Sequence, residues 1–359
     1  MIIPPSSPHI AGPNSVQTVM LLVLLALLPG TMLGIYQFGW PALFLFLITT
    51  SSAVLFEAAS LKIAGKPVAP YCMDFSALLT GWLLAMTLPP WSPWWIGVLG
   101  SFCAIVIGKQ VFGGIGQNLF NPAMLARTIL LVSYPLQMTT WISPHPFGSP
   151  QSPDAAAGWS ITTGGIPDLD AVSSASVLGH VRTDLGMGKL LPDILGPIYH
   201  PLASAVGTVS GSLGETSAFL FLLGGLFLLA KKIITWHIPL AMLVTVALLA
   251  TVFSLSNPDH YAGPLYHLLN GGLMLGAFFI ATDPVSSPVS AAGKLVFGAG
   301  CGVLLFIIRN WGGYPEGMAF AVLLMNAATP LIDHYIKPRI YGHQGTRIGE
   351  FFRRQRRGA

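Results

Sequence analysis

The sequence is poor in charged residues. Only 8% of its 359 residues are Asp, Glu, Lys or Arg, about a third of the share in an average soluble protein. None of these four residue types occurs from Met1 to Phe56, whereas apolar residues make up 53% of the chain. This composition excludes a soluble globular enzyme and a nucleic-acid-binding module. We therefore expect a polytopic membrane protein.

Cysteine is also scarce. The three cysteines, Cys72, Cys103 and Cys301, lie far apart in the sequence and form no C-x-x-C pair. We therefore expect no iron–sulfur cluster, no other metal site and no disulfide framework built from this chain alone. All three are interpreted as small buried apolar residues.

Ten hydrophobic segments are candidate membrane spans, because a hydrocarbon core about 30 Å thick needs about 20 helical residues. Five precede a long polar segment and five follow it. The predicted fold class is an all-α polytopic membrane protein with about ten transmembrane helices in two inverted five-helix repeats. The expected spans are residues 17–36, 41–60, 75–88, 94–108, 119–135, 215–230, 235–254, 266–282, 293–308 and 317–332.

The basic residues orient this topology. With a cytoplasmic N-terminus, thirteen of the seventeen Lys and Arg residues fall on the cytoplasmic side, Lys109 among them. Only Arg182, Lys189 and Arg309 fall outside, and Arg127 lies within a span. The positive-inside rule therefore predicts that both termini are cytoplasmic and that the long polar segment is periplasmic.

Four regions follow from these patterns. They are an N-terminal membrane repeat at 1–136, a periplasmic loop at 137–214 (the connecting segment), a C-terminal membrane repeat at 215–333, and a basic cytoplasmic tail at 334–359. The tail is expected to touch anionic membrane lipid.

The two predicted repeats share weak sequence similarity. Ala77–Pro89 aligns without gaps on Gly272–Pro284, and Lys109–Gln117 aligns on Ile308–Glu316. An odd number of spans in each half would invert one half relative to the other. Transporters with this architecture carry their functional site at the repeat interface.

A Thr-x-Pro element recurs in the two halves, at Thr87–Pro89 and Thr282–Pro284. Proline disfavours helix both at its own position and at the preceding residue, so both helices are expected to end or break there. Two interpretations stay open: ordinary helix ends at the membrane surface, or freed backbone that lines a cavity.

Three charged residues within or near spans need separate treatment. Glu57 lies deep in the second span, where a charge is costly and usually functional. Arg127 either pairs with Glu57 or binds an anionic head group. Asp283 either caps the following loop or contributes to a site.

The connecting segment contains the sequence Asp170-Ala-Val-Ser173-Ser174-Ala175-Ser176. By composition it is an ordinary Asx or serine turn. It also resembles the D-x-x-[ST]-[GS]-A-[ST] motif at which a periplasmic flavin transferase attaches FMN through a phosphoester. The acceptor in that motif is the last hydroxyl, here Ser176. This chain has serine where threonine is usual.

Two further stretches are similar to signatures of one family, which comprises RnfD of the Rnf complex and NqrB of the Na⁺-translocating NADH:quinone reductase. They are Gly108–Met124 (GKQVFGGIGQNLFNPAM), and Tyr314–Gly317 (YPEG) with Leu324–Ala327 (LMNA). The short chain without a long N-terminal extension favours the Rnf branch.

The resemblance implies a flavin-carrying inner-membrane component of a ferredoxin:NAD oxidoreductase that moves Na⁺ or H⁺. It implies covalent FMN on Ser176, a bound riboflavin as a further cofactor, and Rnf subunits A, B, C, E and G as partners. No side chain carries electrons reversibly, whereas a flavin does. Candidates for the flavin or ion environment are Thr80, Asn118, Asn121, Arg127, Asp283 and Glu316.

Two alternative functions stay open. A permease for a small solute or ion would use the same inverted repeats without flavin. A structural component whose flavin site has decayed would keep Ser176 as a relic. The glycines at Gly113, Gly114 and Gly116 are not a nucleotide fingerprint, because no strand precedes them, and a tight loop or close packing explains them better.

Overall fold

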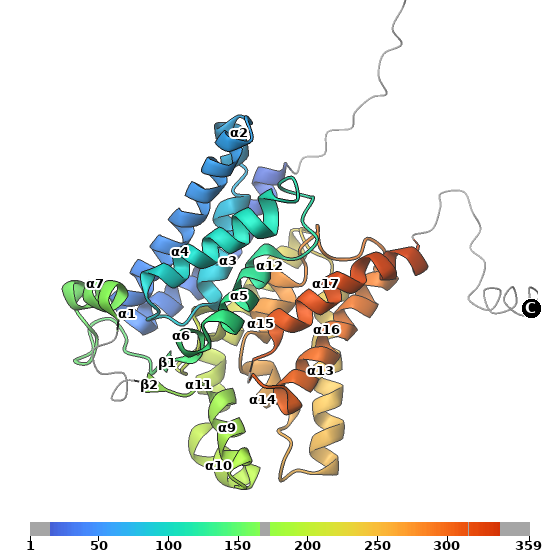
Figure 1. Cartoon of the computed structure of the whole chain (residues 1–359). Helices are drawn as coiled ribbons and strands as arrows, with labels where there is room; N and C mark the ends of the chain where they lie inside the picture. The colour runs from blue at the N-terminus through green and yellow to red at the C-terminus, as the bar shows by residue number, and fades with distance from the viewer. Residues whose placement is uncertain (1–14, 166–172, 315, 338–359) are drawn as a thin grey trace, which may run out of the picture.

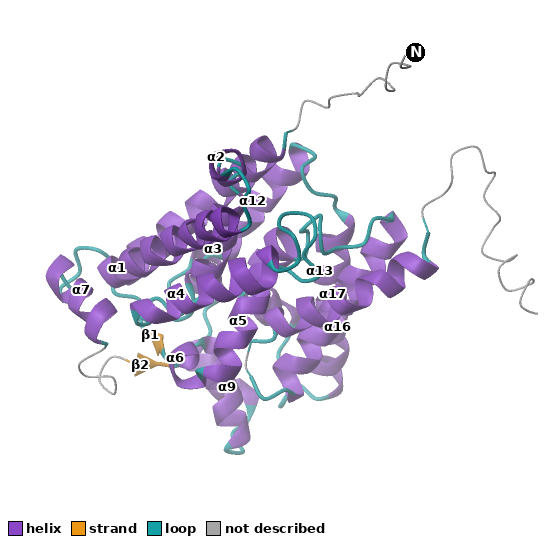
Figure 2. Ribbon diagram, turned by 45° about the horizontal axis from the view of Figure 1, so that its top comes forward, coloured by secondary structure: helices purple, strands orange, loops and turns teal. Residues whose placement is uncertain are grey.

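The computed structural model describes residues 15–165, 173–314 and 316–337. The regular secondary structure of these residues is almost entirely helical (Figure 2), apart from one antiparallel pair of two-residue strands, β1 (Trp141–Ile142) and β2 (Ser173–Ser174). Together with the apolar composition, this confirms the predicted all-α polytopic membrane fold. The number of membrane crossings and the inverted repeat stay predictions.

The first two predicted spans form one helical element, α1 (Val16–Ile63). Its 48 residues would extend about 72 Å if straight, more than twice the thickness of a hydrocarbon core. The element is interrupted at Gly39, where φ is 72° and ψ is −157°. Only glycine adopts such a conformation readily. The break therefore falls in the predicted gap between residues 36 and 41.

The rest of the first half is a set of shorter helices (Figure 1). Asn121 caps α5, because its Oδ1 accepts hydrogen bonds from the backbone N–H groups of Ala123 and Met124. The elements are α2 (Val68–Cys72), α3 (Ser76–Thr87), α4 (Trp94–Phe102), the π-helical η1 (Cys103–Gln110) and α5 (Pro122–Ser133).

The connecting segment is folded rather than extended. Its short helices are too brief to span a membrane, as the sequence predicted, and several lie together in the lower part of Figure 1. A small apolar cluster that includes Val177, Leu191 and Tyr266 holds α9 and α10 against the second half. The helices are α6 (Pro135–Thr139), α7 (Ala155–Gly164), α9 (Val177–Gly186), α10 (Leu191–Ile198), α11 (Pro201–Val206) and the 3₁₀ turn η2 (Leu213–Glu215).

The second half mixes long helices with interrupted ones. The predicted span 266–282 is interrupted once, at Asn270–Gly272, after which α15 continues directly into η3, whereas the neighbouring spans are continuous. The elements are α12 (Ala218–Ala230), α13 (His237–Ser256), α14 (Pro264–Leu269), α15 (Leu273–Leu275), the π-helical η3 (Gly276–Ile280), α16 (Ala291–Trp311) and α17 (Met318–Tyr335).

Three helices among the described residues are long and apolar enough to cross a membrane by themselves: α1, α13 and α16. Four shorter apolar helical stretches accompany them, at Ser76–Thr87, Trp94–Gln110, Pro122–Ser133 and Ala218–Ala230. Short helices that end inside the apolar body leave backbone groups to be satisfied by other means.

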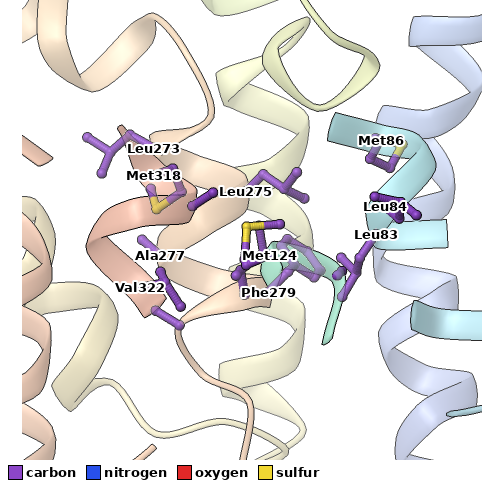
Figure 3. Close-up of a cluster of buried hydrophobic side chains, with 14 of the residues drawn as sticks. Leu83, Leu84, Met86, Met124, Leu273, Leu275, Ala277, Phe279, Met318 and Val322 are labelled. Carbon is purple, nitrogen blue, oxygen red and sulfur yellow. The ribbon is translucent and has the colours of Figure 1, made fainter. Parts of the chain in front are cut away.

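The two halves meet at one apolar core. Figure 3 shows part of this core, with Met124 of α5 next to Phe279 of η3, Leu83 of α3 beside them, and residues of α15 and α17 nearby. Met124 is 1% exposed. A thioether side chain fills irregular space well, which suits a position where several helices end.

Glycines in α12 allow close contact between helices. A Cβ atom at Gly224 would lie 2.5 Å from the backbone oxygen of Ala26 on α1. Backbone cannot yield as a flexible side chain can, so α1 and α12 would have to separate. In contrast, a Cβ atom at Gly313 would have no neighbour within 4 Å.

We expect Gly224→Ala to destabilise the protein by about 1–3 kcal/mol, because the added methyl group overpacks a backbone contact. The measurement is the thermal unfolding midpoint of the detergent-solubilised chain, followed by size-exclusion chromatography. Gly313→Ala is the matched control and should leave the midpoint unchanged. An unchanged midpoint for Gly224→Ala would contradict this close approach of α1 and α12.

Candidate functional site

A cleft of about 850 Å³ lies where the two halves meet, and four of the predicted site residues line it: Thr80, Asn118, Asn121 and Asp283. Val19 and Val23 of α1, Leu228 of α12 and Phe278 of η3 give the cleft mostly apolar walls. Apolar walls with a few polar groups for orientation are typical of a small-molecule site.

Asn121 fixes the two halves to each other beside this cleft. Its backbone N–H donates to Oδ1 of Asn326 on α17 at 3.1 Å, and its Nδ2 donates to the carbonyl of Ile280 at 3.4 Å. Asn326 in turn donates to the carbonyl of Ser286 at 3.1 Å. Asn121 and Asn326 are both buried, so these bonds satisfy the free backbone at the end of η3.

Asp283 caps the chain that follows the second Thr-x-Pro element. Its Oδ1 accepts from the backbone N–H of Val285 at 3.3 Å, and its Oδ2 accepts from the Ser286 hydroxyl at 2.9 Å. The capping interpretation is therefore the one that the geometry supports. The residue nevertheless lines the cleft with Thr282 and Pro284, so freed backbone at this break does border a cavity.

Glu57 pairs with Lys109 and not with Arg127, so one of the two predicted roles for Arg127 is wrong. The distance from Lys109 Nζ to Glu57 Oε1 is 2.9 Å, and Nζ also donates to the Ser76 hydroxyl at 2.7 Å. Lys109 is 3% exposed and lines the central cleft. Sequence reasoning placed Lys109 in a loop, because it follows the predicted span 94–108 directly and no local signal marks it as a buried partner.

Arg127 and Glu316 lie together at a second, smaller cavity of about 250 Å³. Arg127 donates to the carbonyl of Thr87, at the end of α3, and its Nη2 lies 3.7 Å from Glu215 Oε1. The guanidinium therefore satisfies a helix C-terminus inside the protein. Glu215 is a functional candidate that the sequence did not indicate, because it stands at the border of a polar loop.

Arg309 plays the same part in the second half. It donates to the carbonyls of His267 at 2.7 Å and Asn270 at 2.9 Å, where α14 ends, and to Glu316 Oε2 at 3.0 Å. Arg309 is 6% exposed, so it is not the loop residue that charge counting assumed. One arginine from each half thus satisfies a helix end and lies beside a glutamate.

Ser176 is the N-cap residue of α9. Its Oγ accepts a hydrogen bond from the backbone N–H of Gly179 at 3.1 Å, and the residue is 6% exposed. Ser173 and Ser174 form strand β2, which pairs with Trp141 and Ile142. Ala175 is exposed, and Asp170 lies outside the described residues.

α9 is attached firmly to the membrane helices. Arg182, on the second turn of α9, directs its Nη1 to the carbonyls of Ile308, Arg309 and Tyr314 at 3.3 to 3.5 Å. These carbonyls lie at and after the end of α16, where a cation is favoured. Ser176 itself borders a cavity of about 210 Å³ with Glu215, Asn270 and Gly271, separate from the central cleft.

The glycine-rich stretch after η1 is a tight loop, as the sequence predicted. Gly113, Gly114 and Gly116 all have positive φ values, of 119°, 107° and 84°. L-residues adopt this region at a cost, so glycine is required by the turn. Lys66 fastens the loop by donating to the Gly113 carbonyl at 3.2 Å.

We expect Arg309→Met to destabilise the protein by about 3–5 kcal/mol, because Glu316 would keep a buried charge without its guanidinium partner. Arg309→Met combined with Glu316→Gln should recover part of the loss. Thermal midpoints of the wild type, both single variants and the double variant give the coupling. Additive losses would show that the two residues do not act as a pair.

Comparison with known proteins agrees with this arrangement. Residues 4–342 match the NQR2, RnfD, RnfE family. A protein from Stutzerimonas stutzeri, named as the D component of an ion-translocating oxidoreductase complex, is 55% identical over 92% of this chain and 93% of its own length. Proteins with the same name from Rhodobacter capsulatus and Escherichia coli SMS-3-5 are 52% and 44% identical, and the alignments cover 86% and 94% of this chain and 86% and 98% of theirs. The resemblance seen in the sequence is confirmed: the chain belongs to the NQR2, RnfD, RnfE family.

Proposed function

We propose that this chain is the flavin-carrying membrane component of an ion-translocating oxidoreductase complex. Its relatives are named as the D component of such a complex, and the alignments cover nearly the full length of both chains. The complex is a ferredoxin:NAD oxidoreductase of the Rnf type that couples electron transfer to Na⁺ or H⁺ movement. The membrane helices and the buried charge pairs suit a protein that works inside the bilayer.

FMN is attached to Ser176 through a phosphoester. The observation that carries this assignment is the position of Ser176 at the N-terminus of α9, a ten-residue helix. A phosphate on this hydroxyl would stand at the positive end of the helix, beside backbone N–H groups that Ser176 Oγ now caps. The motif residues Asp170, Ser173, Ser174 and Ala175 would serve recognition by the flavin transferase.

The surroundings of α9 fit a flavin. The 210 Å³ cavity at Ser176 is too small for an isoalloxazine ring, but a cavity of about 1000 Å³ lies along the same helix, where Leu178 and Val181 line it. Tyr261, Trp311 and His267 line it from the second half. Planar aromatic walls with hydrogen-bonding groups suit a planar heteroaromatic ring.

His267 supports this fit. It is 3% exposed, borders the large cavity, and neither of its ring nitrogens has a hydrogen-bond partner within the described structure. A buried polar group without a partner is rare, and an absent ligand explains it. When bound, the flavin supplies reversible one- and two-electron chemistry. The chain orients the ring and excludes water.

A second, non-covalent flavin occupies the central cleft. The cleft does not border Ser176, so the ring of a flavin esterified to Ser176 would have to cross the protein to reach the cleft. Riboflavin needs no phosphate site, and Lys109, the one Lys or Arg among the described residues that line this cleft, is already bonded to Glu57 and Ser76. Thr80, Asn118 and Asn121 offer hydrogen-bonding groups against an apolar wall, which suits its ring.

The chain is placed in the bacterial inner membrane with both termini cytoplasmic and the connecting segment periplasmic. Thirteen of its Lys and Arg residues then lie on the cytoplasmic side by sequence, although Lys109 is buried. Rnf subunits A, B, C, E and G are its partners, and a periplasmic flavin transferase modifies it. A permease without redox function is the alternative, favoured by the size of the central cleft alone.

We expect Ser176→Ala to lose covalent flavin completely when the chain is produced with an active flavin transferase, and Ser176→Thr to keep it. The measurement is in-gel flavin fluorescence of the denatured chain, with mass analysis of the peptide that contains residue 176. Covalent flavin on Ser176→Ala would move the acceptor to another hydroxyl, and a dark wild-type band would favour the permease.

Ser176→Asn is the matched control for folding. Asparagine is as good an N-cap as serine, whereas alanine costs about 1 kcal/mol at that position. Ser176→Asn should therefore keep the thermal midpoint of the wild type and still carry no covalent flavin. This separates loss of the ester from loss of α9.

We expect Thr80→Val to lower the amount of non-covalent riboflavin that copurifies with the protein by roughly tenfold, which corresponds to about 1.4 kcal/mol for one lost hydrogen bond. Valine keeps the shape of threonine and removes only the hydroxyl. Flavin released by denaturation is quantified by chromatography. Thr251→Val on the exposed face of α13 is the matched control, and equal riboflavin in both variants would exclude the cleft as the site.

A further inference from the structure

Glu215 is the least satisfied buried carboxylate at the point where the two halves meet the connecting segment. It ends η2 and is 7% exposed. It lines two cavities at once, the 250 Å³ cavity with Arg127 and Glu316, and the 210 Å³ cavity with Ser176. Each leaves about 10 Å³ for the centre of a water molecule, which is enough for about one water.

Glu316, which lines the 250 Å³ cavity together with Glu215, is a carboxylate with several hydrogen-bond donors. It accepts from Arg309 Nη2 at 3.0 Å and from the backbone N–H groups of Gly272 and Met318, each at 3.2 Å. Its negative charge is therefore stabilised by three donors.

Glu215 differs because one of its oxygens, Oε1, has no hydrogen-bond partner within the described structure. Arg127 Nη2 lies 3.7 Å away, too far for a hydrogen bond, while Nη1 of the same guanidinium is engaged with the Thr87 carbonyl. The Ser212 side chain hydrogen-bonds the Glu215 carboxyl group. A proton added at Oε1 would break none of these hydrogen bonds, although it would neutralise the carboxylate that faces Arg127.

The charges that face Glu215 come from three elements. Arg127 belongs to α5, Glu316 to the turn before α17, and Arg309 to α16, behind Glu316. The helices α1, α3 and α15 also contact η2, and none of them contributes a charged residue to the described lining of either cavity. Two positive and two negative groups thus balance when Glu215 is ionised.

We propose that Glu215 is a proton-exchange site between the cavity at Ser176 and the cavity at the interface of the two halves. In the uptake step a hydronium ion in one cavity transfers its proton to Glu215 Oε1, an O–H bond forms, and a water molecule remains. Release to a water molecule in the other cavity reverses the step. The Arg127 guanidinium, 3.7 Å away, holds the ionised form.

The local chemistry selects a proton rather than a metal cation. A bound cation needs several oxygen ligands, whereas two guanidinium groups flank this site and Glu316 is already saturated with donors. The inference does not rest on the flavin assignment, because it uses only residues of this chain and its test needs no reduction of a cofactor.

The test is pH-difference infrared spectroscopy of the full chain in lipid nanodiscs, in the region of the carboxylic acid C=O stretch. The wild type should show a band for a buried protonated carboxyl group in acidic buffer that disappears in alkaline buffer. Glu215→Gln should lose this band completely. The control is Asp184→Asn, which removes an acid on α9 that pairs with Lys189. This variant should keep the band.

Two results would overturn the proposal. One is an unchanged band in Glu215→Gln. The other is a band that Na⁺ abolishes at constant acidic pH, which would indicate a cation site instead. If Glu215→Gln does not elute as a folded protein, Glu215→Asp replaces it: a shifted band supports the proposal, and an unshifted band contradicts it.

Discussion

The structure depends on how interrupted helices are satisfied inside an apolar body. A helix that ends within the membrane leaves carbonyl groups without partners, and lipid offers none. Arg127 donates to the Thr87 carbonyl at the end of α3, and Arg309 donates to the His267 and Asn270 carbonyls at the end of α14. Each guanidinium then needs a counter-charge, which Glu215 and Glu316 supply. Broken helices thus impose buried ion pairs.

The same constraint determines where cavities form. Helices that stop short leave space beyond their ends, and polar groups recruited to satisfy the backbone line that space. Asn121 and Asp283 both hydrogen-bond free backbone groups, and both border the central cleft. A site made in this way is rigid, because each polar side chain is held by a structural hydrogen bond. Under the proposed function, rigid polar groups against apolar walls would hold a flavin ring in one orientation, which is what control of its redox potential requires.

Hydrophobic segments, breaks and the glycine loop could be predicted from the sequence, because they depend on local chemistry. Spans, the Gly39 interruption between residues 36 and 41, and the positive φ values at Gly113 and Gly114 all follow from composition and spacing. The pairing of buried charged side chains could not be predicted, because it depends on which helices face each other. The Lys109–Glu57 pair joins residues 52 positions apart, and nothing in the local sequence distinguishes Lys109 from a loop lysine. Four of the candidate site residues do share a cleft, whereas Arg127 and Glu316 belong to a different cavity.

Ser176 lies where the connecting segment is attached to the membrane helices. The hydroxyl belongs to the connecting segment, yet α9, which it caps, is fixed to the end of α16 by Arg182. Arg182 binds the carbonyl of Arg309, and the Arg309 side chain binds Glu316. α9 is therefore linked through two contacts to Glu316, at the interface of the two halves. A change of charge on a flavin carried by α9 would act on these groups through short contacts in a medium of low dielectric constant, where electrostatic interactions are strong. That proximity gives a physical route from electron transfer to the membrane interior without a large movement of any helix.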